Sequence, residues 1–202
     1  AVTGNPVVDS LLRFAETAKP NRQLAKLIES TSGTRRILLT THRRESFGSA
    51  MEGNLRVLKE FVGSRTDLSL LFPVHPNPNV RKVANSILGG IDRVFLLEPL
   101  GYSDFIALVQ ASWLIVSDSG GVQEEAPSFG KPLLVIRANT ERPEAVEAGV
   151  AKLVGDSSKA LKGHLEQAYG DETWINSVKK QKNPFGDGRS AERIVKFILR
   201  KI

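Results

Sequence analysis

Short apolar runs alternate along this chain with segments of helical period, and this alternation constrains the fold more than any other feature. The runs are rich in Val, Ile, Leu and Phe and lie at residues 37–39, 68–72, 94–97, 113–116, 133–136 and 152–154. Most of them lack the alternation of polar and apolar residues that is typical of a strand with one solvent-exposed face, so we expect both faces to be buried. Buried strands separated by helices indicate an α/β fold with a Rossmann-like, doubly wound parallel sheet.

The segments between these runs carry apolar residues at helical spacing. Two such faces are formed by Met51, Leu55, Leu58 and Val62, and by Phe105, Leu108 and Val109. Two further helices are expected before the first strand, at residues 7–18 and 22–30. The residues ahead of them, Thr3-Gly4-Asn5-Pro6, suit a turn or a hinge better than a helix interior.

Composition narrows the class of protein. A chain of 202 residues suits one domain, and its 41% hydrophobic and 25% charged residues are typical of globular proteins. There is no apolar run long enough to span a bilayer, so we expect no membrane segment. The chain has no cysteine, which excludes disulfides and thiolate metal sites. It begins with Ala1 and carries no leader, so we expect it to be a piece of something longer.

The net charge of +6 comes mainly from the C-terminal quarter. Residues 150–202 contain 11 Lys and Arg against 6 Asp and Glu, a net charge of +5, whereas residues 1–149 contain 17 against 16. Lys179, Lys180 and Lys182 form a small cluster without the interleaved aromatic residues of a stacking platform. We expect a solvated helical surface rather than a nucleic-acid site, with an anionic partner as the alternative.

Candidate ligand-binding side chains are concentrated in the loops that follow the predicted strands, because ligands of such sheets bind at the carboxyl ends of the strands. The first loop, THRRESFG, presents three potential cations, His42, Arg43 and Arg44. The second, PVHPNPNVR, presents His75 in a loop stiffened by prolines. The loops after the fourth and fifth runs read DSGGVQEE and IRANTERPE.

The fourth loop has the pattern of an anion site. Ser119, Gly120 and Gly121 fall at a strand-to-helix turn, where backbone N–H groups and the helix dipole attract a phosphate. Glu125 lies about one helical turn further on, within reach of the vicinal hydroxyls of a ribose. The pattern therefore favours a nucleotide site. A plain turn with Ser119 as the N-cap stays open, and so do structural roles for the loop histidines and arginines.

Nicotinamide and ATP sites are disfavoured, because no Gly-x-Gly-x-x-Gly or Walker-type string occurs. Six strings instead resemble, in order and spacing, the C-terminal domain of the non-hydrolysing UDP-N-acetylglucosamine 2-epimerases: VTGNPVVD, THRRESFG, PVHPNPNVR, DSGGVQEEAPSFGKP, TERPEAVEAG and NPFGDG. The resemblance implies that residues 1–202 are the second domain of a glycosyltransferase B-like pair of Rossmann-like domains. Residues 1–6 would be the hinge to a first domain that this chain lacks.

The resemblance also implies an activity. The family interconverts UDP-N-acetylglucosamine and UDP-N-acetylmannosamine, for bacterial envelope polysaccharides, by eliminating UDP and adding it back. It implies a cytoplasmic homodimer that needs no redox cofactor and no metal, and whose partner is the nucleotide sugar. The proton-moving carboxylates would lie in the first domain. We therefore expect this chain to bind UDP without turnover.

Residue roles carry over by motif. The resemblance implies a nucleotide site in which Ser119, Gly120 and Gly121 hold the diphosphate and Glu125 binds the ribose. Arg142 of the TERPE string would bind the nucleotide, and Phe105 would help to form the uracil pocket. His42 would lie near the phosphates and is the implied catalytic residue. In regulated members, the residues matching Arg44 and His75 help to form a neighbouring regulatory site.

Five positions depart from the family pattern. Thr41 replaces a usual Gly, Ser46 a usual Asn, Ala138-Asn139 a commoner Asp-Thr, and Leu100 a glutamine of some members. The first two put the geometry around His42 in doubt. Two other readings stay open: half of a UDP-sugar glycosyltransferase, which would need an acceptor, and a stand-alone nucleotide-binding regulatory module.

Overall fold

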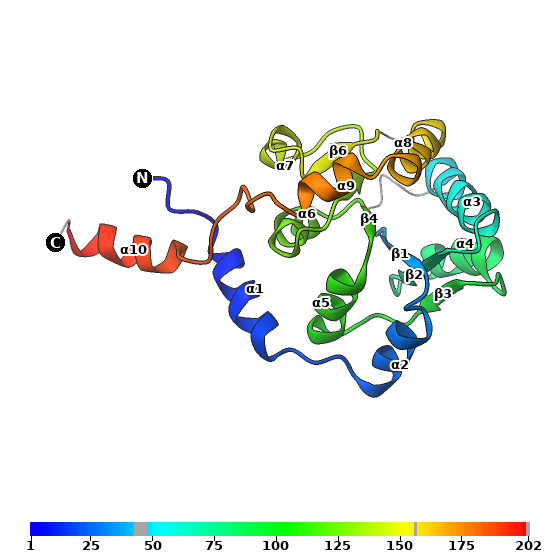
Figure 1. Cartoon of the computed structure of the whole chain (residues 1–202), viewed down its shortest axis with the longest axis horizontal. Helices are drawn as coiled ribbons and strands as arrows, with labels where there is room; N and C mark the ends of the chain where they lie inside the picture. The colour runs from blue at the N-terminus through cyan, green and yellow to red at the C-terminus, as the bar shows by residue number, and fades with distance from the viewer. Residues whose placement is uncertain (43–47, 156, 201–202) are drawn as a thin grey trace.

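A computed structural model describes residues 1–42, 48–155 and 157–200 as one parallel sheet with helices on both faces (Figure 1). The strands are β1 (Arg35–Thr40), β2 (Leu68–Pro73), β3 (Val94–Leu97), β4 (Leu114–Ser117), β5 (Leu133–Val135) and β6 (Ala151–Leu153). They are ordered β3-β2-β1-β4-β5-β6, and every neighbouring pair is parallel. The predicted Rossmann-like doubly wound sheet is confirmed.

The helices that precede and cross over the sheet follow the predicted segments. They are α1 (Pro6–Thr17), α2 (Arg22–Ser30), α3 (Ser49–Gly63), α4 (Pro78–Leu88), α5 (Tyr102–Ala111), α6 (Gly120–Glu125), the 3-10 turn η2 (Ala126–Phe129), α7 (Pro143–Glu147), α8 (Ser158–Gly170), α9 (Thr173–Val178) and α10 (Ser190–Leu199). The boundaries differ from prediction by one or two residues. Pro6, assigned to the hinge, is the first residue of α1, because Asn5 caps that helix and proline suits its first turn.

Alternate residues of the central strand show why its sequence is apolar throughout. Ile37 and Leu39 of β1 pack into one core layer, on the face covered by α3, α4 and α8. Leu38 packs into the second layer, which includes Leu24 of α2, Leu108 of α5 and Val122 of α6. Each of the three side chains is at most 1% exposed. A strand buried on both faces needs no polar alternation, as the sequence predicted.

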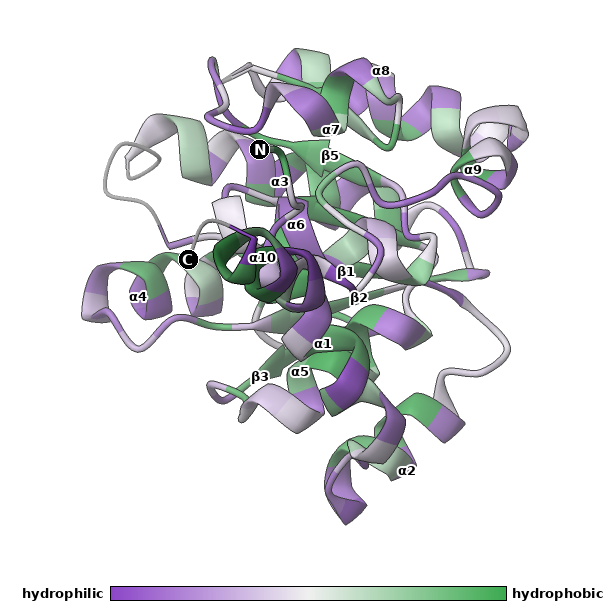
Figure 2. Cartoon of the chain, turned by 90° about the vertical axis from the view of Figure 1, so that its left-hand side faces the viewer, coloured by the Kyte–Doolittle hydropathy of each residue, from purple (hydrophilic) through white to green (hydrophobic). Residues whose placement is uncertain are grey.

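The last helix is the exception to this burial. In Figure 1 α10 projects away from the body of the domain, on the same side as the N-terminus. Figure 2 shows strongly hydrophobic residues along it, and four of them, Val195, Phe197, Ile198 and Leu199, are 44–68% exposed. Its N-terminus is held by α1, where the buried Asp9 carboxylate accepts hydrogen bonds from the backbone N–H groups of Ser190 and Ala191.

Candidate functional site

The middle of the sheet is where a ligand crevice is expected. The chain winds outward in opposite directions from β1 and β4, so the loops that follow these two strands diverge and leave a gap at their carboxyl ends. The last residues of the two strands, Thr40 and Ser117, are paired in register, and their hydroxyl oxygens lie 2.6 Å apart. This contact brings Thr41 and His42, which follow β1, close to the start of the DSGG loop, which follows β4.

Asp118 joins the two loops. Its side chain is fully buried, and its carboxylate accepts hydrogen bonds from the Thr41 hydroxyl at 2.8 Å and from the His42 backbone N–H at 3.0 Å. The same carboxylate lies 3.2 Å from Nδ1 of His42. A buried acceptor at Nδ1 favours the proton on that nitrogen and leaves Nε2 as the ring atom available to a ligand.

The sequence interpretation passed over Asp118, although a signal was present. An acidic residue immediately after a buried strand, beside a glycine pair, has to be paired or hydrogen-bonded when it is buried. Thr41, noted as a departure from the family pattern, supplies one of those hydrogen bonds. A glycine at position 41 has no hydroxyl to donate, so the departure adds a contact within the site.

His42 and His75 lie next to each other, as expected for neighbouring loops. Their rings stack with centroids 5.9 Å apart and planes inclined by 27°. His75 Nδ1 also accepts the backbone N–H of Asn77 at 3.2 Å, which fixes that ring at the start of α4. Arg44 and Ser46 lie outside the described residues, so the predicted pairing of Arg44 with His75 stays a prediction.

The predicted anion turn begins α6. Ser119 occupies the N-cap position but makes no capping hydrogen bond through its side chain, contrary to the simplest structural alternative. Gly120 and Gly121 form the first turn, and neither has a positive φ, so backbone strain does not require glycine there. Among the residues that the structure describes, a Cβ on Gly121 would meet only the Ser119 hydroxyl, at 3.9 Å. Those residues therefore leave open space above Gly121.

Arg142 is brought to α6 by a short network of side chains. Its backbone N–H donates to the Thr140 hydroxyl at 3.0 Å, and that hydroxyl donates to Gln123 at 2.6 Å. Its guanidinium Nε donates to the buried carboxylate of Glu124. The TERPE loop is thereby fixed against the helix that carries the DSGG turn.

Glu125 lies at the end of α6, partly buried, and one of its oxygens accepts a hydrogen bond from the Tyr102 hydroxyl at 2.9 Å. Burial raises the pKa of the Glu125 carboxyl; the hydrogen bond from Tyr102 opposes that rise and the charge of Glu124 adds to it. The sequence interpretation did not anticipate Tyr102. Phe105, one turn further along α5, is partly buried and packs against the second core layer.

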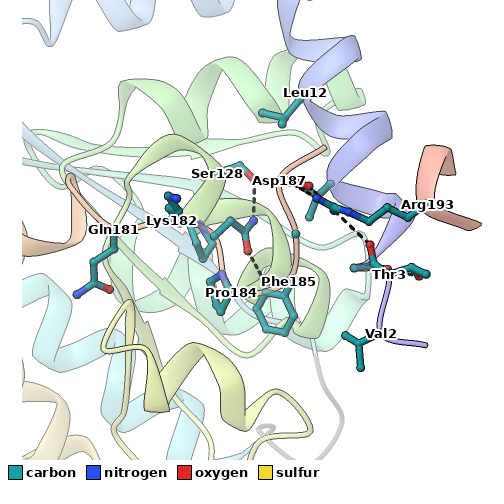
Figure 3. A pocket seen from close by; sticks show the side chains of 15 residues that line it. Val2, Thr3, Leu12, Ser128, Gln181, Lys182, Pro184, Phe185, Asp187 and Arg193 are labelled. Atoms are coloured by element: carbon teal, nitrogen blue, oxygen red, sulfur yellow. Dashed lines mark hydrogen bonds and ion pairs between the residues drawn. The ribbon is translucent and has the colours of Figure 1, made fainter. Parts of the chain in front are cut away.

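A separate pocket of about 600 Å³ lies away from this edge of the sheet (Figure 3). It is formed by residues 2–4, α1, η2 and the loop at residues 181–187. Its charged pair, Asp187 and Arg193, is joined by two contacts of 2.7 Å, and Arg193 also reaches the Thr3 carbonyl at 3.4 Å. Because these charges satisfy each other, and no predicted site residue lines the pocket, we place the site at the carboxyl edge instead.

The sequence model of the UDP-N-acetylglucosamine 2-epimerase family matches residues 1–199. The chain belongs to this family. A probable UDP-N-acetylglucosamine 2-epimerase of Ralstonia nicotianae is 44% identical over 98% of the chain, and the match covers 54% of that protein. The chain thus spans about half the length of the curated relatives it matches.

Two solved epimerase-family structures carry the same fold. The S. aureus MnaA–UDP co-structure is 40% identical, with a TM-score of 0.90 over 99% of this chain and 55% of its own. The Neisseria meningitidis UDP-GlcNAc 2-epimerase bound to UDP-GlcNAc is 37% identical, with a TM-score of 0.88 over 98% of this chain and 54% of its own. The predicted family is confirmed.

Two kinds of feature, a metal-ligand cluster and a membrane-spanning helix, were searched for in the part of the chain that the structure describes. No three side chains of His, Cys, Asp or Glu there lie close enough together to hold a metal ion. No helix within the same residues is long and apolar enough to cross a bilayer.

Proposed function

We propose that this chain is the UDP-binding half of an enzyme that interconverts UDP-N-acetylglucosamine and UDP-N-acetylmannosamine. The observation that carries the proposal is the turn at Ser119, Gly120 and Gly121, where the helix start lacks a side-chain cap and a Cβ on Gly121 would project into open space. Phosphate oxygens can accept hydrogen bonds from the backbone N–H groups of an uncapped helix start, and they need open space beside it. Family membership, and the UDP and UDP-GlcNAc named for two relatives, support the same ligand.

Around that turn, each remaining residue has a role in the proposal. Glu125 accepts from the ribose hydroxyls and Phe105 lines the uracil pocket. Arg142, close to α6 through Glu124, binds the nucleotide from the facing loop. His75, stacked on His42, belongs with Arg44 to a neighbouring regulatory site.

His42 assists departure of UDP. With Asp118 accepting at Nδ1, protonation of Nε2 gives an imidazolium that donates to a phosphate oxygen as negative charge develops there. Removal and return of the sugar carbon-2 proton need a base and an acid within hydrogen-bond reach, and we assign those groups to a first domain outside this chain.

The proposed first domain also accounts for the exposed side chains of α10. Val195, Phe197, Ile198 and Leu199 form an apolar helix surface beside the N-terminus. Contiguous exposed apolar surface marks a contact surface in many proteins. In the whole protein, which we propose to be a cytoplasmic homodimer acting in polysaccharide synthesis, the first domain covers this helix.

Calorimetry with UDP tests the binding half of the proposal. Half of a cleft makes half of the contacts, so we expect a Kd on the order of 0.1 to 1 mM. Glu125→Gln and Arg142→Ala should each weaken binding, since charge-assisted hydrogen bonds contribute about 1.5 to 3 kcal/mol. Glu124→Gln/Arg142→Ala is the control, because it removes the guanidinium without leaving a buried carboxylate unpaired. Unchanged UDP affinity in all three variants would contradict this placement.

A second experiment tests the division of labour between domains. The chain is incubated with UDP-N-acetylglucosamine in heavy water, and the carbon-2 proton is followed by NMR. We expect neither deuterium at carbon 2 nor UDP-N-acetylmannosamine, because the proposal assigns the proton-transfer groups to the first domain and because water screens charge in the open site. Deuterium uptake above a His42→Ala control would show that this half carries its own acid and base.

A third experiment tests the glycosyltransferase alternative. The proposed whole protein, assayed without an acceptor, should form UDP-N-acetylmannosamine from UDP-N-acetylglucosamine, whereas a transferase would not.

A further inference from the structure

The contact between Tyr102 and Glu125 joins two successive helices, α5 and α6, which are separated along the chain by β4. Tyr102 is the first residue of α5 and Glu125 is the last residue of α6, yet the phenol oxygen and the carboxylate Oε1 are 2.9 Å apart. The other carboxylate oxygen, Oε2, makes no hydrogen bond to any residue that the structure describes. Glu125 is therefore held at one oxygen and open at the other.

The ionisation of the pair fixes which group donates. Burial raises the pKa of the Tyr102 phenol, and the hydrogen bond to Glu125 and the charge of that carboxylate raise it further. The phenol stays protonated at neutral pH and is the donor, while the carboxylate is the acceptor. A carboxylate that already accepts one hydrogen bond is stabilised in the ionised form that sugar hydroxyls bind best.

The position of the Tyr102 ring is set by a third helix. Phe14 of α1 packs against it with ring centroids 4.9 Å apart and planes inclined by 45°. Helix α1 also contacts both α5 and α6. Tyr102 as a whole is 43% exposed, so it is not part of the buried core. Its hydroxyl is held by the Glu125 carboxylate and its ring by Phe14.

We propose that Tyr102 is a positioning residue that orients the Glu125 carboxylate toward the ribose and makes the site select ribonucleotides over 2′-deoxyribonucleotides. The proposal rests on the proposed binding of UDP at Glu125. Oε1 has a second lone pair, so it can accept from Tyr102 and from one ribose hydroxyl, while Oε2 accepts from the adjacent hydroxyl. Without the phenol, the carboxylate can rotate away from this bidentate geometry.

The test compares UDP with 2′-deoxy-UDP, which keeps the same base and diphosphate. Calorimetric Kd values are measured for the wild-type chain, Tyr102→Phe, Glu125→Gln and the double variant. Tyr102→Phe keeps the ring that Phe14 contacts and removes only the hydroxyl. We expect the wild type to prefer UDP about tenfold, which corresponds to one good hydrogen bond to a charged group. In Tyr102→Phe the preference should fall to about twofold to threefold, with 2′-deoxy-UDP binding unchanged.

The pH dependence of the same ratio adds a readout that a structural role would not move. The described groups that act on the Glu125 carboxyl are Tyr102 of α5 and Glu124 of the same helix, and Glu124 is paired with Arg142. The preference for UDP should be present while Glu125 is ionised and should be lost as pH falls through its pKa. In Tyr102→Phe that loss should begin at higher pH, because the hydrogen bond that lowers this pKa is gone.

The outcomes separate this inference from the function on which it rests. If the wild-type chain binds neither nucleotide, the proposed function fails and this inference fails with it. If the wild type binds UDP and Tyr102→Phe keeps the full preference for UDP, the role of Tyr102 is wrong while UDP binding stands. A double variant that discriminates less than Glu125→Gln alone would also contradict it, because Tyr102 would then act independently of Glu125.

Discussion

The two ends of the parallel sheet both carry charged side chains, but they hold them in different ways. At the amino ends of the strands, Arg35 pairs with Asp67 and Glu172 in groups that are 38–42% exposed, and its guanidinium lies over the rings of Trp113 and Tyr169. At the carboxyl ends, Asp118 is fully buried and accepts hydrogen bonds from the loop that contains His42.

This difference distinguishes charges that hold the fold from charges arranged for a ligand. The amino-end ions pair with one another in contact with solvent, where such pairs contribute little energy. At the carboxyl end the Asp118 carboxylate is buried, close to a Ser119 hydroxyl that makes no capping contact and to the open space that the described residues leave above Gly121. Burial of a charge is costly unless it is compensated, so its location is informative about function.

The largest expected effect comes from one aspartate at each end. Asp118→Ala leaves the Thr41 hydroxyl and the His42 N–H buried without their acceptor, and we expect a loss of about 3 kcal/mol in unfolding free energy. The matched control, Asp67→Ala, removes an exposed pair with Arg35 and a hydrogen bond from Tyr169, and should cost about 1 kcal/mol or less. Urea denaturation measures both, and equal losses would contradict the comparison.

Gly121→Val tests whether the open space belongs to a ligand. We expect UDP affinity to fall at least about tenfold, because a branched side chain enters the space assigned to phosphate. The fold should survive, since φ is ordinary and the nearest atom to a Cβ is 3.9 Å away. Gly163→Val in α8 is the control, because a Cβ there meets nothing within 4 Å among the described residues. If circular dichroism shows that Gly121→Val is folded and the variant keeps full UDP affinity, the phosphate site is contradicted and this segment is a plain turn.

Two serines close in the sequence should separate stability from binding. Ser119→Ala removes a hydroxyl that caps nothing, so we expect the unfolding free energy to change by less than about 0.5 kcal/mol while UDP affinity drops about fivefold. Ser117→Ala removes a buried hydroxyl that bonds Thr40 and accepts the Ser119 N–H, and should cost about 1 to 2 kcal/mol in stability. The reverse pattern, measured by denaturation and calorimetry, would assign Ser119 to the fold.

The smallest effect is expected at the amino end. Glu166→Gln removes the salt bridge with Arg65. Because the Glu166 side chain is 44% exposed, we expect the unfolding free energy to change by no more than about 0.5 kcal/mol. The change should shrink in 0.5 M salt as the pair is screened. UDP affinity should not change. A change in UDP binding would show that the two ends of the sheet are coupled.

The sheet was predictable because its signal is local. Each strand is an apolar run bounded by helical segments, and the six predicted runs correspond to β1 to β6. The boundaries shift only slightly; Trp113, for example, was predicted in the fourth strand and lies just before β4. The buried helix face of Met51, Leu55, Leu58 and Val62 was predicted from spacing for the same reason. Local patterns are sufficient when both faces of a sheet are covered.

The contacts within the site were less predictable, because they join residues far apart in the chain. The spacing of the loops indicated His42, Ser119 and Glu125, but not that Asp118 accepts from the His42 loop or that Tyr102 donates to Glu125. Pairings of this kind depend on side-chain directions at the ends of two elements. No periodicity in either segment encodes them.

The pairing of β1 with β4 also has a kinetic consequence. Thr40 and Ser117 meet at a sequence separation of 77 residues, and the contact of Thr41 with Asp118 spans the same separation. Contacts of such high sequence separation form slowly, because the closure entropy of the intervening chain opposes them until the central strands pair. The histidine and its aspartate therefore come together only when the two halves of the sheet have joined. A ligand at this point would bind the completed fold alone, so it would slow the unfolding of the entire domain and protect its central amides from hydrogen exchange.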